Sequence, residues 1–383
     1  MAVRNAHCLA SLGFETHLCL GAGPESETTA DLRKFYGLTH PPSLRIHRTS
    51  RQSRFACGKN STSGPIFRTA LRLGRSLLKN HQKTPIAFIT REASFLPHLT
   101  WLVSRSRRRI RGYYEAHDFY ADLSWRGKEG LPVKIQDRRQ SWLERVFLPH
   151  LNGLIAITEA QRELYRRRFP GLSSVALPLG TEPFFEQKLK NFEARRQLRR
   201  AVYVGRLSRG KGLELLLRAA PKLTEAGVRI AFWGGNAEQS AKLAARAREA
   251  GATNGIECVS SRSPEELHQA LANDASIGLV PLEDGFYNRY LTCPVKALDY
   301  LSHGLPAVAT DLPSTREVLG NANAGVYVPP SDHTALTAAV LDILDDPERY
   351  QTAAKAACAR AREISWSSRA QKIVDLVTAG ADS

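Results

Sequence analysis

The chain has 383 residues, of which 43% are hydrophobic and 24% are charged. This length exceeds what one ordinary hydrophobic core holds, so we expect a globular protein of two or three domains. We expect no transmembrane helix, because no apolar run approaches the length that spans a bilayer, and no signal peptide, because the first residues lack its layout.

The six cysteines are scattered and show no spacing typical of metal ligands: Cys8, Cys19, Cys57, Cys258, Cys293 and Cys358. Structural disulfides and zinc are therefore not expected. This cysteine usage favours the reducing cytoplasm.

The formal net charge is +17, and arginines cluster in the segments 105–111 and 166–168. A basic surface attracts an anionic partner, and Trp101 and Leu102 beside the first cluster suggest the cytoplasmic face of an anionic membrane. The alternatives are a phosphorylated substrate or a basic face that is simply solvated. No nucleic-acid-binding module accompanies the charge, so nucleic acid is not an expected partner.

In the first half of the chain, hydrophobic periodicity predicts alternating helices and strands. Helices are expected at 3–13, 66–80, 95–107, 139–151 and 157–169; strands at 14–21, 85–90, 109–117, 153–158 and 173–181; and an exposed loop at about 40–65. Such alternation is typical of parallel βαβ units, which open with a strand. Here a helix comes first, so the first strand of this domain is expected to be missing.

The second half repeats the alternation more regularly. Strands are expected at 199–205, 228–235, 256–260, 276–282, 305–310 and 325–329, and helices at 213–227, 240–251, 263–275, 294–304 and from 334 onward. Ser263 and Glu266 form the pattern of a capping box at one helix start. The rhythm pauses near residues 178–190. We therefore predict an α/β protein with domains at 1–180 and 181–365 and a terminal helical segment at 366–383.

The segment Gly205–Gly212, GRLSRGKG, lies between a predicted strand and a predicted helix. It approaches the P-loop pattern, but Gly212 stands where a magnesium-binding hydroxyl is required, which argues against a nucleoside triphosphatase. Arg206 and Lys211 would lie at the carboxyl end of a strand beside a helix N-terminus, a place that attracts a diphosphate. The alternative is a glycine-rich turn with solvated cations.

A second segment, residues 292–311, begins with Thr292, Cys293, Pro294 and Val295. Proline in the first turn of a helix leaves backbone N–H groups free to bind an anion. Asp299 would follow on the same helix as an acceptor for two ribose hydroxyls. The alternative is an ordinary capped helix with a solvated carboxylate.

Taken in order, four segments resemble retaining GT-B glycosyltransferases of family 4, the glycosyl transferases group 1. They are YVGRLSRGKGLELLLRA, IAFWGG, VSSRSPEELHQALANDASIGLVPL and CPVKALDYLSHGLPAVATD. The resemblance covers residues 196–378. It implies two Rossmann-like, doubly wound domains facing across a cleft, with the terminal helix crossing back to the first domain.

The resemblance also implies an activity: transfer of a hexose-type residue, with retention, from a UDP- or GDP-linked sugar to a saccharide or lipid-linked acceptor. Polysaccharide or glycolipid synthesis is the implied setting, without metal or other cofactor. Arg206 and Lys211 would contact the donor diphosphate, residues 292–295 the diphosphate and sugar, Asp299 the ribose, and Val259 and Ser260 the base. The first of the family's paired glutamates falls on Leu291, so the donor sugar stays open.

The first half resembles the family's acceptor domain more loosely. In GYYEAHDF, His117 takes the position of the family's catalytic-site histidine, with Glu115 and Asp118 as orienting neighbours. Arg91 ends another predicted strand and would face the acceptor or a phosphate. The alternatives are a loop histidine and a structural arginine.

A competing hypothesis is a catalytically impaired GT-B protein that acts as partner or scaffold of another glycosyltransferase. Leu291 and the missing first strand favour this alternative. A nucleotide-sugar epimerase has less support, because no pair of carboxylates marks a strand end.

Overall fold

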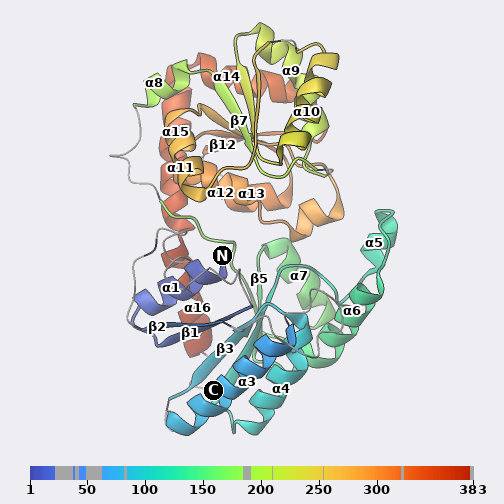
Figure 1. Cartoon of the computed structure of the whole chain (residues 1–383), viewed down its shortest axis with the longest axis vertical. Coiled ribbons are helices and arrows are strands. Elements are labelled where there is room, and N and C mark those ends of the chain that lie inside the picture. Colours follow the sequence, from blue (N-terminus) through green and yellow to red (C-terminus); the bar gives the residue numbers. More distant parts are fainter. Residues whose placement is uncertain are drawn as a thin grey trace. The chain divides into compact units, whose positions relative to one another are not determined.

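The computed structural model describes residues 1–21, 38, 43–48, 63–81, 84–183, 191–208, 210–252, 254–320 and 323–379. The chain divides into two compact units. Unit 1 contains Met1–Leu177 and Arg369–Ser383, and unit 2 contains Pro178–Ser368. Each unit is α/β with parallel strands, as the alternating pattern predicted (Figure 1).

The sheet of unit 2 has six parallel strands in the order β12-β11-β10-β7-β8-β9. They are β7 (Arg200–Val204), β8 (Arg229–Trp233), β9 (Ile256–Val259), β10 (Ile277–Val280), β11 (Ala307–Thr310) and β12 (Gly325–Val328). Counted from β7, this is the Rossmann order, in which the winding direction reverses between the first and fourth strands. The reversal point, between β7 and β10, is where such sheets bind ligands.

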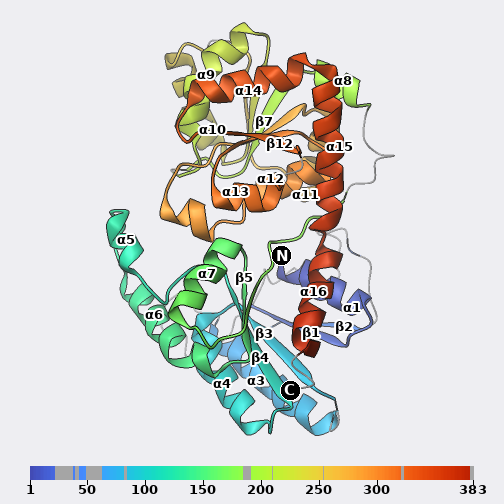
Figure 2. The same cartoon turned by 180° about the vertical axis from the view of Figure 1, so that it is seen from behind.

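Helices cover both faces of this sheet, and Figure 2 shows α14 lying across it. The helices are α8 (Phe192–Gln197), α9 (Leu213–Glu225), α10 (Ala237–Glu249), α11 (Pro264–Asn273), α12 (Val295–Ser302), α13 (Pro313–Leu319), α14 (His333–Asp345) and α15 (Pro347–Glu363). The last helix, α16 (Trp366–Ala379), belongs to unit 1 from Arg369 onward. The capping box of Ser263 and Glu266 opens α11, as predicted. The helical region after residue 334 is interrupted because Asp346 caps a new helix that begins with Pro347.

Tyr300, on α12, anchors that helix to the sheet where β7 and β10 part. The two strands pair only at Ile277–Ala201 and Gly278–Val202. Beyond this point the Tyr300 hydroxyl accepts a hydrogen bond from the Val204 N–H (2.9 Å) and donates to the Val202 carbonyl (3.0 Å). A Cβ on Gly278 would lie 2.2 Å from the Tyr300 ring, so this position has no room for a side chain.

Unit 1 contains two parallel sheets. The four-stranded sheet has the order β3 (Ile86–Thr90), β4 (Ile110–Ala116), β5 (Gly153–Ala156) and β6 (Ser174–Ala176), and the two-stranded sheet pairs β1 (Thr16–Leu20) with β2 (Leu44–Arg48). In a doubly wound sheet the first strand lies between the second and the fourth. Among the described residues no strand precedes α1 (Ala2–Ser11), and β1 and β3 share no neighbouring strand.

The strand β2 corrects the expected exposed loop at about 40–65. Leu44 is buried against Ala6 and Ala10 of α1, and Ile46 packs on the same cluster. The alternation of these two side chains with basic residues therefore forms a strand despite its charge. Residues 40–42 and 49–62 of the expected loop lie outside the described part of the chain.

The remaining helices of unit 1 are α3 (Ser63–Asn80), α4 (Leu96–Arg105), α5 (Ser124–Lys128), α6 (Ile135–Phe147) and α7 (Glu159–Arg168). Within the residues that the structure describes, none of the helices has the length and apolar character needed to cross a bilayer.

The basic segment 105–111 is only partly available to a partner. Leu102 is buried, which contradicts its expected place on an interaction surface. Arg109 donates to the carbonyls of Leu78 and His81, and Arg111 donates to the carbonyl of Val377. Long arginine side chains satisfy buried carbonyls in this way, so two of the expected surface cations have structural roles.

We predict that Tyr300→Phe destabilises unit 2 by about 1–3 kcal/mol, because the buried Val204 N–H loses its acceptor. Thermal unfolding followed by circular dichroism measures the loss. Tyr327→Phe is the control, since its half-buried hydroxyl makes one hydrogen bond, to the Gly320 carbonyl. Equal midpoints for Tyr300→Phe and wild type would contradict the anchoring role.

Candidate functional site

The loop after β7 is held tightly at the reversal point of the sheet. Gly212 caps α9 in the left-handed region, at φ +76°, and a Cβ there would lie 1.4 Å from the carbonyl oxygen of Pro281, just after β10. The Asn288 side-chain amide donates to the Gly210 carbonyl (2.9 Å) and to the Glu283 carbonyl (2.8 Å). Only glycine fits at 212, which explains why this loop departs from the P-loop pattern.

Two cations on this loop have no carboxylate partner among the described residues. Arg206 is exposed and Lys211 is half-buried. Neither forms an ion pair within the described part of the chain. Burial, together with the positive charge of Arg206, lowers the pKa of Lys211. An anion placed beside both groups would relieve their repulsion.

A cavity of about 420 Å³ opens beside Arg206, within the size range of small-molecule sites. It is lined by residues at the carboxyl ends of β7 and β8 and by the segment after β9, among them Gly205, Arg206, Trp233, Gly234, Ser261 and Arg262. The Arg262 guanidinium lies 4.5 Å from the centroid of the Trp233 ring. An aromatic plane and a stacked cation suit a planar, anionic ligand such as a nucleotide.

The residues predicted for base binding lie next to this lining. Val259 ends β9, and its carbonyl accepts the Gly234 N–H (2.8 Å). Ser260 is exposed, and the cavity wall is formed by the next two residues. Trp233 could not be predicted as a site residue from the sequence, because it ends a strand whose other residues are mostly core.

The start of α12 differs from the prediction in detail. The helix begins at Val295, and Pro294 is its N-cap rather than a residue of the first turn. Cys293 is buried, and the Thr292 hydroxyl donates to the Tyr287 carbonyl (3.2 Å) in a π-helical turn. These residues therefore reach α12 in an extended conformation.

Two further positions on this segment concern the predicted carboxylates. Asp299 is half-buried on α12, as predicted from the helical pattern. Leu291 ends the π-helical turn and is fully buried. The position where the resembling family has its first glutamate is therefore part of the core of unit 2.

In unit 1, the structure brings Arg91, Glu115 and His117 together. One Glu115 carboxylate oxygen lies 2.7 Å from an Arg91 guanidinium nitrogen and 2.9 Å from His117 Nε2. Arg369, on α16, approaches the same oxygen at 3.3 Å. Burial alone would raise the pKa of Glu115, but Arg369, His117 and Arg91 outweigh it and lower this pKa to about 2. Glu115 is thus ionised, and it orients the His117 ring.

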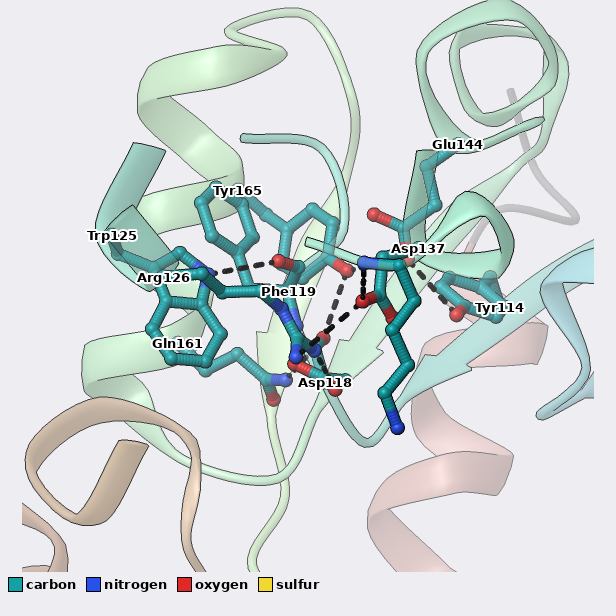
Figure 3. Close-up of polar contacts among 10 residues, drawn as sticks. Tyr114, Asp118, Phe119, Trp125, Arg126, Asp137, Glu144, Gln161 and Tyr165 are labelled. Carbon is teal, nitrogen blue, oxygen red and sulfur yellow. Dashed lines mark hydrogen bonds and ion pairs between the residues drawn. The ribbon is translucent and has the colours of Figure 1, made fainter. Parts of the chain in front are cut away.

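The backbone that follows His117 is fixed by a polar network, which Figure 3 shows. The Asp118 carbonyl accepts hydrogen bonds from Gln161 Nε2 and from the Tyr165 hydroxyl, both at 3.0 Å. The Asp118 carboxylate pairs with Arg126 at 3.2 Å. Asp118 therefore anchors its own loop rather than the imidazole.

Glu144, on α6, is connected to this network through the Tyr165 hydroxyl. Its carboxyl accepts hydrogen bonds from the hydroxyls of Tyr114 (3.0 Å) and Tyr165 (2.9 Å) (Figure 3). Burial raises the pKa of Glu144 to about 8 despite these two donors. In the folded protein the Glu144 carboxyl is therefore protonated and uncharged at neutral pH, and it needs no cation as a partner.

Comparison with known proteins finds a family model that matches within unit 2. Residues 199–346 match the family model described as Glycosyl transferases group 1. The chain is 28% identical over 182 residues to D-inositol 3-phosphate glycosyltransferase of Corynebacterium urealyticum, covering 45% of this chain and 41% of that protein. It is 27% identical over 236 residues to glycogen synthase of Mycobacterium tuberculosis, covering 59% and 53%. The chain thus spans about half the length of these curated relatives.

Solved structures resemble the whole chain. Sucrose-phosphate synthase from Thermosynechococcus elongatus has a TM-score of 0.65 at 19% identity, over 99% of this chain and 92% of that one. Anabaena HepE in complex with UDP and glucose has a TM-score of 0.66 at 14% identity, over 99% and 96%. These likenesses, with the two Rossmann-like units, establish the GT-B fold.

We predict that Glu144→Gln flattens the dependence of stability on pH. The folded state keeps the Glu144 proton up to about pH 8, whereas the unfolded chain releases it near the usual glutamate value of 4.5. Between these values wild-type stability falls as pH rises, by up to about 1.4 kcal/mol per pH unit. The variant keeps an acceptor for both tyrosines. Its thermal midpoint should therefore rise relative to that of the wild type as the pH increases from about 5 to about 8. Parallel profiles would contradict a protonated Glu144.

Proposed function

We propose that this protein is a glycosyltransferase that moves a hexose-type residue from a UDP- or GDP-linked sugar to a saccharide or lipid-linked acceptor. The observation that carries the proposal is a pair of cations on the loop after β7, Arg206 and Lys211, which have no carboxylate partner among the described residues; Arg206 also lines the cavity at the carboxyl ends of β7 and β8. The match to group 1 glycosyltransferases supports it, as does the UDP and glucose in the similar HepE structure. Polysaccharide or glycolipid synthesis is the proposed setting.

Departure of the nucleoside diphosphate leaves negative charge on its β-phosphate oxygen. Arg206 and Lys211 would stabilise this charge by charge-assisted hydrogen bonds, without a metal ion. The base would stack in the cavity near Trp233, and Asp299 would accept ribose hydroxyls. Residues 292–295 would offer their backbone to the diphosphate and the donor sugar.

The acceptor side is assigned to unit 1. His117, oriented by Glu115, would contact the reacting sugars, and Arg91 would hold Glu115 ionised. Transfer with retention of anomeric configuration is proposed from the resemblance to family 4. A GT-B partner protein that binds a nucleotide sugar without transferring it is the second candidate, favoured by the buried Leu291.

We further propose that the protein works in the cytoplasm and contacts an anionic membrane through α6. Ile135, Trp142 and Val146 recur at the spacing of one helix face and are 89%, 57% and 39% exposed. Arg138 and Arg145 are exposed on the same helix and, with Trp142, line a cavity of about 750 Å³. An apolar stripe flanked by cations is typical of helices that lie in a membrane interface.

We expect Arg206→Ala and Lys211→Ala each to weaken the binding of UDP or GDP about 10- to 100-fold, because a charge-assisted hydrogen bond contributes about 1.5–3 kcal/mol. Calorimetric titration in EDTA needs no acceptor and also tests metal independence. Lys222→Ala, on the last turn of α9, is the control. Unchanged affinity in both site variants, or binding that requires added Mg²⁺, would contradict this site.

For the membrane surface, we expect the chain to sediment with vesicles that contain phosphatidylglycerol and not with phosphatidylcholine alone. Each basic residue near the surface contributes about 1 kcal/mol, and salt should weaken the attraction. The double variant Ile135→Ser and Trp142→Ala should lose binding, while Trp101→Ala should keep it. If anionic vesicles fail to carry down the wild type at low salt, the surface has another role.

A further inference from the structure

Lys296, on α12, has a buried ammonium group that the proposed site does not use. It lies one helical turn before Tyr300, which anchors α12 to the sheet. Within the described residues, its Nζ is buried and has no hydrogen-bond partner. The nearest attractive group is the Tyr203 ring, whose centroid is 3.8 Å from Nζ. A ring face compensates only part of the hydration that a buried ammonium loses.

The ammonium lies beside the wall of the donor cavity. Gly205, which lines that cavity, separates them: a Cβ on Gly205 would lie 3.7 Å from Lys296 Cε and 3.9 Å from Nζ. Tyr203 itself is tied to the loop, because its hydroxyl donates to the Arg206 carbonyl (2.7 Å). The Lys296 ammonium is therefore adjacent to the backbone that carries Arg206.

The charged and titratable surroundings of Lys296 come from four segments of the chain. Tyr203 faces it from β7, and Lys211 acts on it from the loop before α9. Asp299 and Tyr300 follow on α12. In the segment after β10, Asp284 is already engaged in an ion pair with Arg289. Burial lowers the pKa of Lys296 to about 7, and the charge of Lys211 contributes in the same direction.

We propose that Lys296 is a third cation for the donor diphosphate, beside Arg206 and Lys211, and that it takes up a proton as the anion binds. This inference rests on the proposed donor site. The incoming negative charge favours the ammonium form of Lys296, so the proton comes from solvent and no covalent bond changes. Without ligand, the amine form avoids repulsion from Lys211.

Calorimetry at pH 7 with UDP-glucose and GDP-mannose tests this inference. Their phosphates are diesters that hold no proton at this pH, so a dependence of the binding heat on buffer ionisation enthalpy reports protons taken up by the protein. In PIPES and in Tris, the wild type should take up about half a proton, since a group with a pKa near 7 is half charged at this pH. Lys296→Met should show no uptake and bind at least tenfold more weakly.

The thermal midpoint of Lys296→Met and one control variant separate this role from a structural one. Lys296→Met should keep or raise the thermal midpoint, because it removes an unpaired buried charge, whereas loss of a structural lysine would lower it. Lys222→Met should retain both affinity and proton uptake. Unchanged uptake or unchanged affinity in Lys296→Met overturns the inference alone. Failure of the wild type to bind either sugar nucleotide overturns the donor site and this inference with it.

Discussion

The Tyr300 hydroxyl lies where β7 and β10 separate, and the geometry of unit 2 at the carboxyl edge of its sheet depends on this contact. Parting strands leave backbone groups without ladder partners, and here one phenol satisfies both the Val204 N–H and the Val202 carbonyl. The same contact fixes the rotation of α12 about its axis. It thereby sets where Lys296 and Asp299 lie relative to the loop that carries Arg206.

The two units treat charge in opposite ways. In unit 1, Glu115 is surrounded by Arg91, His117 and Arg369, so the cations there share an anionic partner inside the protein. In unit 2, Arg206 and Lys211 have no carboxylate within ion-pair distance among the described residues, and burial depresses the pKa of Lys211 further. Cations without an anionic partner suit a dianionic ligand, because the ligand supplies the charge that the protein lacks. This contrast supports placing the diphosphate in unit 2.

Local patterns explain what the sequence could predict. The strands and most helices of unit 2 follow from apolar periodicity, and Arg206 and Lys211 follow from their place after a predicted strand. Contacts between segments that lie far apart in the sequence could not be predicted. The pairing of Glu115 with Arg369 depends on how α16 docks, and β2 is too short and too basic to recognise without its partner α1. Trp233 and Lys296 resemble core and surface residues until the sheet topology brings them to one edge.

The late position of Arg369 in the sequence determines when unit 1 can be completed during synthesis. The residues that bind Glu115 on its own sheet are made early, but Arg369 leaves the ribosome only after the whole of unit 2. Until then the nascent unit 1 holds a buried carboxylate with one guanidinium fewer, and residues 1–177 lack the last helix that covers them. Synthesis thus completes unit 2 first. The Glu115 carboxylate that contacts His117 gains its Arg369 partner only when α16 has been made.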